Sequence, residues 1–298
     1  MPMQIGAVFP QTEIGADVGA VRAYAERVQE LGFAHILAYD HVVGADPAVH
    51  APWRGPYDIS TTFHEPLVLF GYLAAVTPLE LVTGVIILPQ RQTALVAKQA
   101  AELAVLSSGR LVLGLGTGWN HVEYEALGMP YEDRGARLTA QAIVIRRLLD
   151  EPVIDHADDY HRIDRAGILP LPPGPIPIWF GGASEPALRR AAHLGDGFLF
   201  GAAGKGVRSQ LERLRELLDE QGRDPASFHV EAQIDFARGE GAWVAERDKW
   251  EAIGGDYLSV QTMDVVAKWA GREELNGFTS AAQHIEALEI FMRVVNEA

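Results

Sequence analysis

The feature that most limits the fold of this chain is a repeated alternation. Short runs rich in Val, Ile, Leu and Phe are each followed by a segment with helical periodicity. Runs that are apolar throughout are typical of strands buried on both faces of a parallel sheet. We expect strands at residues 5–9, 35–39, 81–88, 111–115, 176–180, 197–200, 228–236 and 257–261. Eight strand–helix units predict an α/β fold and favour a closed (β/α)8 TIM barrel over a doubly wound open sheet.

Helical segments follow these strands along most of the chain. Residues 17–31 form an amphipathic pattern that ends at Gly32, a residue type that often stops a helix. Its predicted apolar face consists of Val18, Val21, Ala25, Val28 and Leu31. We expect further helices at residues 67–76, 94–106, 136–150, 185–194, 207–221, 241–252 and 279–296. A long loop at 44–62 and an inserted segment at 151–175, which we interpret as a small hairpin, interrupt the alternation within a single domain of residues 1–298.

The composition excludes several classes of function. The chain has no cysteine, so disulfides, thiolate catalysis and Cys-ligated metal centres are excluded. Its 40 acidic and 25 basic residues give a net charge of −15, which is unfavourable for binding nucleic acid or an anionic membrane. No apolar run reaches the roughly 20 residues of a transmembrane helix, and the first residues lack the pattern of a signal peptide. We therefore expect a cytoplasmic protein that binds neither nucleic acid nor a membrane.

Chemistry is expected at the ends of the predicted strands, because active sites of such barrels lie at the carboxyl ends of the strands. The strand at 35–39 ends in Asp40-His41. This carboxylate and imidazole could fix a heterocyclic cofactor and move a proton near neutral pH. They could equally serve as a helix cap and a loop histidine.

Glycines mark two further strand ends. Gly84 lies inside the strand at 81–88, where a glycine indicates either a bulge with close backbone approach or simple packing. The strand at 111–115 runs into Gly116-Thr117-Gly118-Trp119-Asn120. This is not the dinucleotide-binding fingerprint, because Trp119 stands where a third glycine is required. The glycines of this segment still let a flat ring or a phosphate approach the main chain, and the indole of Trp119 and the amide of Asn120 would lie beside that ligand. The alternative interpretation is a simple turn.

A fourth candidate segment, Gly181-Gly182-Ala183-Ser184, lies between the strand at 176–180 and a predicted helix. Free N–H groups at a helix N-terminus attract phosphate, and the glycine pair favours a phosphate site over ordinary capping by Ser184. His156 and His161 flank an acidic stretch in the inserted segment, where a solvated loop is the better interpretation. We expect no metal ligands.

Together these features resemble the bacterial-luciferase-like monooxygenase superfamily, and most closely its branch of oxidoreductases that use the deazaflavin coenzyme F420. The resemblance covers nearly the whole chain and is strongest from Gly32 to Gly135. It is carried by Gly32-Phe33 leading to Asp40-His41, by Thr83-Gly84-Val85, by Ala97-Lys98-Gln99 through Ser108-Gly109-Arg110, by Gly114 to Asn120 with Glu123, by Gly181 to Ser184 and by Gly195-Asp196-Gly197.

The resemblance implies a role for each matching residue. Asp40 would hydrogen-bond the deazaflavin ring, and His41 would donate a proton beside it. Gly84-Val85 would form a non-prolyl cis peptide and a bulge behind the ring. Trp119 and Asn120 are expected beside His41 at the catalytic site on the evidence of the strand end itself, where they offer a stacking face and an amide. The other cofactor contacts would be Ile87, Gly116, Thr117, Gly118, Glu123, Gly181, Gly182, Ala183 and Ser184, with Gly181 and Gly182 at the phosphate.

Trp119 departs from the sugar-phosphate dehydrogenases of this family, which carry a glutamate at the matching position. That departure, together with the lack of an obvious basic cluster, argues against a sugar-phosphate substrate. The aromatic residues Trp53, Tyr57, Phe63 and Trp119 are candidates for an apolar substrate lining, or for loop packing.

We therefore expect an enzyme that transfers a hydride between coenzyme F420 and an organic substrate, with His41 as the proton donor. An FMN-dependent luciferase-like monooxygenase is the alternative. A metal-assisted barrel hydrolase and a cofactor-binding protein without turnover are further alternatives. Because the family usually forms dimers through barrel helices, we also expect a homodimer.

Overall fold

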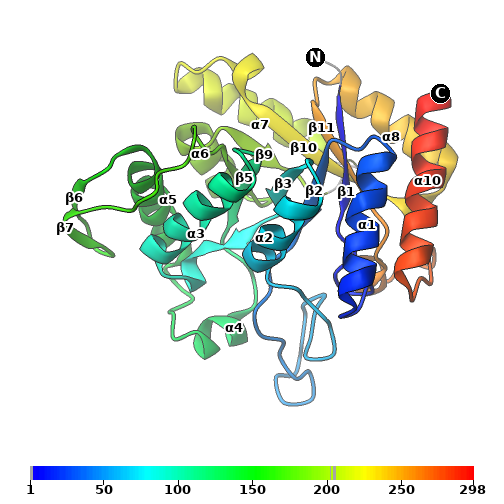
Figure 1. Cartoon of the computed structure of the whole chain (residues 1–298), viewed down its shortest axis with the longest axis horizontal. Coiled ribbons are helices and arrows are strands. Elements are labelled where there is room, and N and C mark those ends of the chain that lie inside the picture. Colours follow the sequence, from blue (N-terminus) through cyan, green and yellow to red (C-terminus); the bar gives the residue numbers. More distant parts are fainter. Residues whose placement is uncertain (1–2, 202, 204–205) are drawn as a thin grey trace.

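Eight parallel strands close into a barrel in the computed structural model, which describes residues 3–201, 203 and 206–298 (Figure 1). The strands are β1 (Gln4–Val8), β2 (His35–Ala38), β3 (Glu80–Thr83), β5 (Leu111–Gly116), β8 (Ile178–Gly181), β9 (Gly197–Leu199), β10 (His229–Asp235) and β11 (Tyr257–Gln261). Each pairs with its neighbour along the chain, β3 pairs with β5, and β11 returns to β1. The (β/α)8 barrel predicted from the alternation is confirmed.

Helices surround this barrel (Figure 1). They are α1 (Val18–Glu30), α2 (Pro66–Val76), α3 (Thr93–Leu106), α5 (Arg134–Asp150), α6 (Glu185–Leu194), α7 (Val207–Glu220), α8 (Glu240–Ala252) and α10 (Ala281–Glu297). In α1, Asp17 caps the first turn by accepting a hydrogen bond from the N–H of Gly19. Val18 was predicted on its buried face but is 65% exposed, because it lies in the first turn, while Tyr24 is buried and donates to the Val8 carbonyl.

The predicted strand at 81–88 is wrong in one respect. After β3 the chain bends at a cis peptide between Gly84 and Val85, and resumes as the short strand β4 (Ile86–Ile87) and the 3-10 turn η1 (Leu88–Gln90). Two short helices, α4 (His121–Ala126) and α9 (Val265–Trp269), were not predicted, and neither were η2 (Pro225–Ser227) and η3 (Phe236–Arg238). The cis bond agrees with the expectation from the family resemblance.

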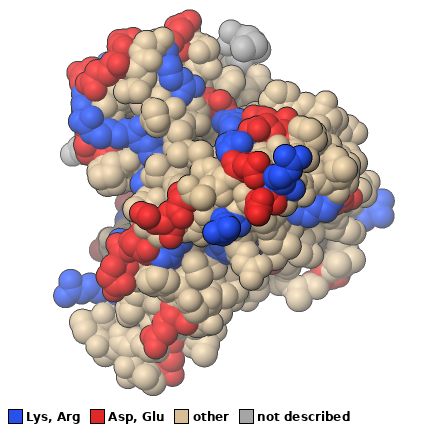
Figure 2. Space-filling model, turned by 90° about the vertical axis from the view of Figure 1, so that its left-hand side faces the viewer, with Lys and Arg blue, Asp and Glu red and all other residues tan. Residues whose placement is uncertain are grey.

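The inserted segment is an antiparallel hairpin, as predicted. It consists of β6 (Ile154–Ala157) and β7 (Arg162–Ala166), and it lies apart from the barrel strands at the edge of the molecule (Figure 1). On the face that carries it, acidic and basic side chains are interspersed (Figure 2). Within the part of the chain that the structure describes, no helix is both long enough and apolar enough to cross a membrane.

The barrel interior depends on glycines that leave room for neighbouring strands. Gly114 in β5 faces Thr83 in β3, at the seam between these two neighbouring strands. The Thr83 hydroxyl donates to the Gly114 carbonyl at 2.9 Å and accepts from its N–H at 2.8 Å. A Cβ at position 114 would lie 1.9 Å from the backbone oxygen of Thr83, so the two strands would have to separate.

We expect the Gly114→Ala variant to lose about 1–3 kcal/mol or more of unfolding free energy, because overpacking displaces backbone. Urea denaturation of the purified variant measures this loss. The matched control is Gly71→Ala in α2, where an added Cβ meets nothing within 4 Å. The control should be neutral or slightly stabilised, and equal stabilities of the two variants would refute the seam argument.

Candidate active site

A cavity of about 810 Å³ opens at the carboxyl ends of the barrel strands. Its size is within the range of small-molecule and cofactor sites. It is the place where most of the predicted site residues meet. The predicted residues that line it are Asp40, His41, Gly84, Val85, Ile87, Gly116, Thr117, Gly118, Trp119, Gly181, Gly182 and Ala183.

Asp40 lies at the end of β2 with its side chain fully buried. One carboxylate oxygen accepts from the Ile87 N–H at 2.8 Å, and the other accepts from Arg91 at 2.6 Å. Burial raises the pKa of Asp40, and the Arg91 guanidinium and the Ile87 N–H oppose that rise. Both oxygens already have protein donors. Asp40 therefore lines the cavity and also holds β4 and Arg91 in place beside it.

His41 contacts the buried carboxylate of Glu123, which comes from a distant part of the chain. Its Nδ1 lies 3.3 Å from Oε1 of Glu123, and the same oxygen accepts from the N–H of Val43 at 3.0 Å and from that of Val42. Gln90 donates to the other Glu123 oxygen at 2.9 Å. Burial acts to raise the pKa of Glu123, but the hydrogen bonds from His41, Val42 and Gln90 outweigh it and lower the pKa. An ionised Glu123 therefore fixes the His41 ring through Nδ1 and leaves Nε2 for the cavity.

Glu123 was predicted as a cofactor contact, and the structure instead places it behind His41, outside the cavity lining. Asn120 also does not line the main cavity. Its side-chain oxygen caps α4 by accepting from the N–H groups of Val122 and Glu123, and its amide donates to the Val43 carbonyl. Asn120 therefore ties α4 to the segment that follows His41. It lines a smaller hollow of about 180 Å³ beside His41.

The glycines at the strand ends line the cavity and also leave room for neighbouring side chains. A Cβ on Gly116 would lie 2.4 Å from Val85, and one on Gly181 would lie 2.8 Å from the same side chain. A Cβ on Gly118 would lie 2.7 Å from Ile87. These glycines make room for Val85 and Ile87, so the segment after the cis peptide can project toward the cavity and form an apolar wall of it.

Aromatic side chains gather around His41. The ring centroid of His41 lies 4.8 Å from that of Tyr57, 4.9 Å from Phe63 and 5.5 Å from Trp119. Tyr57 and Trp119 line the cavity. Trp53 packs on Trp119 and donates to the Tyr57 carbonyl, so it supports this wall from behind. Of the four candidates, two line the cavity and two are loop packing.

A polar side of the cavity comes from β10, β11 and the segments after them, which sequence reasoning missed. Tyr39 donates to Gln233 at 2.6 Å and lies 3.3 Å from Gln261. Arg238 pairs with Glu246 at 2.5 Å, and Arg272 pairs with Asp235. The only signal in the sequence is that Gln233, Asp235 and Gln261 lie at predicted strand ends.

The predicted phosphate segment is only partly at the cavity. Gly181, Gly182 and Ala183 line it, and Ser184 does not. Ser184 immediately precedes α6, and its side chain makes no capping hydrogen bond. The first turn of α6 offers few donors, because Pro186 has no N–H and the Ala187 N–H donates to the Ser184 carbonyl at 2.9 Å. Phosphate contacts here would come from the strand-end backbone.

We expect the Glu123 carboxylate to stabilise the fold in a pH-dependent way. Its folded pKa lies below the usual 4.5, so its contribution is present above pH 4.5 and is lost as the pH falls through the lowered value. The Glu123→Gln variant should have a lower free energy of unfolding than the wild type at neutral pH, and this difference should shrink in acid. Urea denaturation across a pH series measures it. A difference independent of pH would contradict the assignment.

Comparisons with known proteins identify the family and the fold. A family model for luciferase-like monooxygenases matches residues 3–288. An uncharacterized protein of Mycobacterium tuberculosis is 37% identical over 171 residues, which are 56% of this chain and 59% of that protein. An F420-dependent glucose-6-phosphate dehydrogenase of Intrasporangium calvum is 30% identical over 231 residues, which are 72% of this chain and 65% of that protein. The matched region is thus less than two thirds of the length of these relatives.

Among solved structures, an F420-dependent secondary alcohol dehydrogenase in complex with an F420-acetone adduct has the same fold. It superposes with a TM-score of 0.75 over 99% of both chains, at 16% sequence identity.

Proposed function

The chain belongs to the luciferase-like monooxygenase family, and on that premise we propose that it is an oxidoreductase that transfers a hydride between coenzyme F420 and a small organic substrate. The family assignment agrees with the resemblance found in the sequence. The observation that carries the proposal is the His41–Glu123 pair, whose imidazole faces a cavity of cofactor size beside the apolar wall of Val85 and Ile87. The similarity to the F420-dependent dehydrogenase of Intrasporangium calvum supports F420 as the cofactor.

The cavity has features that fit a flat heterocycle with a polar edge. Val85 and Ile87 form the apolar wall of the cavity. Gln233 and Gln261 line the same cavity with their side-chain oxygens facing Tyr39, so their amide N–H groups are available as donors. Gly181, Gly182 and Ala183 would hold the phosphate through backbone groups. Bound F420 would supply two-electron hydride chemistry at this place.

Residues of this chain would donate or accept the proton that accompanies the hydride. His41 is held through Nδ1 by Glu123, so a proton can be delivered or removed at Nε2. Delivery completes the reduction of a substrate, and removal accompanies its oxidation. Tyr57, Trp119 and Trp269 line the cavity and favour contact with apolar substrate groups.

A sugar phosphate fits this cavity poorly. Among the described lining residues the cationic side chains are Arg238 and Arg272, and each is paired with an acid. Trp119 adds an indole where an acidic or hydroxyl-binding group would serve a sugar. We infer that the substrate is uncharged and at least partly apolar or aromatic.

Titration of the purified protein with F420 and with FMN tests the cofactor. We expect saturable binding of one F420 per chain, with a dissociation constant at least tenfold lower than that for FMN. The Gly116→Ala variant should weaken F420 binding, because its Cβ would push Val85 into the cavity, whereas Gly71→Ala should not. Tight FMN binding with none for F420, together with oxygen consumption, would instead establish the monooxygenase alternative.

A further inference from the structure

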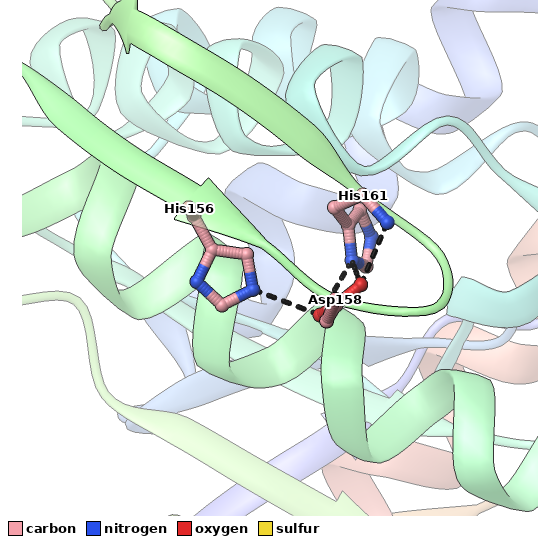
Figure 3. Close-up of side chains that lie close together, drawn as sticks. All are labelled: His156, Asp158 and His161. Carbon is pink, nitrogen blue, oxygen red and sulfur yellow. Dashed lines mark hydrogen bonds and ion pairs between the residues drawn. The ribbon is translucent and has the colours of Figure 1, made fainter.

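The turn of the β6–β7 hairpin places two imidazole rings within hydrogen-bond distance of one carboxylate (Figure 3). His156 lies in β6, His161 immediately precedes β7, and Asp158 lies in the turn between them. Nε2 of His156 lies 2.8 Å from Oδ2 of Asp158, and Nδ1 of His161 lies 3.0 Å from Oδ1. In residues 3–201, 203 and 206–298, this is the one group of three potential ligand side chains whose atoms converge within 4.8 Å.

Asp158 and His161 are also held in place by contacts with the surrounding chain. The N–H groups of Tyr160 and His161 donate to Oδ1 of Asp158 at 2.7 and 2.6 Å. Nε2 of His161 contacts the Thr93 hydroxyl at 2.8 Å, and Thr93 in turn accepts from Gln141 at 3.1 Å. Residues that bind metal through one imidazole nitrogen are oriented by such a contact at the other.

His156 has an outer contact of a different kind, because a guanidinium can only donate. Arg147 donates to Nδ1 of His156, so the ring proton lies on Nε2, and a metal at Nε2 requires the other tautomer. This Nδ1 lies 3.4 Å from Nη1 of Arg147, and Arg147 is itself paired with Glu151 at 2.8 Å. The positive charge of Arg147 is therefore compensated locally. Both imidazoles thus use their outer nitrogens for contacts with α3 and α5, while their inner nitrogens face Asp158.

We propose that His156, Asp158 and His161 bind one zinc-type divalent cation. Two imidazole nitrogens and one carboxylate oxygen are a donor set that zinc accepts, with a solvent molecule as the fourth ligand. Ligands around a tetrahedral zinc lie about 3.3 Å apart, given bonds of about 2.0–2.2 Å. The two His–Asp separations of 2.8 and 3.0 Å would open by a few tenths of an ångström when the metal replaces the shared protons. The two imidazole nitrogens, which lie within 4.8 Å of each other, would take up the same spacing.

The position of the site indicates a structural role. None of the three residues lines the cavity at the barrel mouth. His161 contacts α3 through Thr93, and His156 contacts α5 through Arg147. A bound cation fixes the hairpin turn against α3 through His161 and Thr93. The proposal differs from the expectation from the sequence, where the two histidines were interpreted as part of a solvated loop without metal ligands.

Titration of chelator-treated, full-length protein with Zn²⁺ by calorimetry tests the site. We expect one equivalent to bind, and we expect Asp158→Asn and His161→Gln each to weaken binding at least ~100-fold, more than the loss of an outer contact does. His193→Gln removes a histidine on α6 that lies outside the cluster and should bind Zn²⁺ like the wild type. Mg²⁺ should not compete, because it prefers all-oxygen sites.

A Zn²⁺ soak of wild-type crystals, with anomalous data at the zinc edge, keeps the test independent of whether the variants fold. The expected result is a peak about 2.0–2.2 Å from the three ligand atoms. The proposal is overturned if wild-type protein binds no stoichiometric Zn²⁺, if the peak lies elsewhere, or if the folded ligand variants retain wild-type affinity.

Discussion

The His41→Asn variant is expected to lower kcat for hydride transfer by about 10²–10⁴-fold, the usual contribution of a positioned general acid or base. The variant removes the nitrogen that exchanges the proton at the cavity. Affinity for F420 should stay within about threefold, because the apolar wall and the strand-end backbone are untouched. Stopped-flow measurement of cofactor oxidation or reduction gives kcat, and the binding titration gives the affinity.

Two further variants separate proton transfer from damage to the loop. His121→Asn alters a nearby histidine that does not line the cavity but packs on Trp53, and it should retain kcat within about twofold. Glu123→Gln should lower kcat less than His41→Asn and shift the pH profile, because Glu123 acts through the orientation and charge of His41. Unchanged kcat in His41→Asn would remove His41 from the mechanism.

The Asp40→Asn variant is expected to lose about 3–5 kcal/mol of unfolding free energy, the usual effect of breaking a buried ion pair. The Asp40 side chain is fully buried and that of Arg91 is 15% exposed, so the substitution leaves a guanidinium without its main counter-charge. Glu65, which pairs with Arg91 at 2.9 Å, compensates only in part because it is one-third exposed. Urea denaturation at neutral pH measures the loss.

The matched control for this prediction is Glu26→Gln, which removes an ion pair with Arg22 on the surface of α1. Such exposed pairs are worth about 0–1 kcal/mol. The double variant Asp40→Asn with Arg91→Met should recover part of the loss, because no unpaired charge remains. If Asp40→Asn destabilised the protein no more than Glu26→Gln, the Asp40–Arg91 pair would not hold β4 in place beside the cavity.

The sequence predicted the barrel because its strands are buried on both faces and so appear as uninterrupted apolar runs. The same property concealed the break at Gly84-Val85, since Val85, Ile86 and Ile87 continue the apolar run beyond the bend. The helices α4 and α9 were missed because helices of five or six residues do not complete enough turns to show a periodicity.

The site was predictable where its residues follow a strand end in the sequence, as Asp40, His41 and Gly116 to Trp119 do. Pairings across the barrel were not. His41 and Glu123 are 82 positions apart, and Tyr39 and Gln233 are 194 positions apart, so only closure of the barrel brings them together. Asn120 was predicted at the site because it is a polar residue at a strand end. In the structure it caps α4, a helix that was not predicted.

A crystal structure of the protein soaked with F420 tests the central claim most directly. The account predicts density for the deazaflavin ring in the cavity at the barrel mouth, in contact with Val85 and Ile87 and within reach of Nε2 of His41. Density for the ring away from His41, or a cavity that stays empty at saturating F420 while FMN binds there, would contradict it.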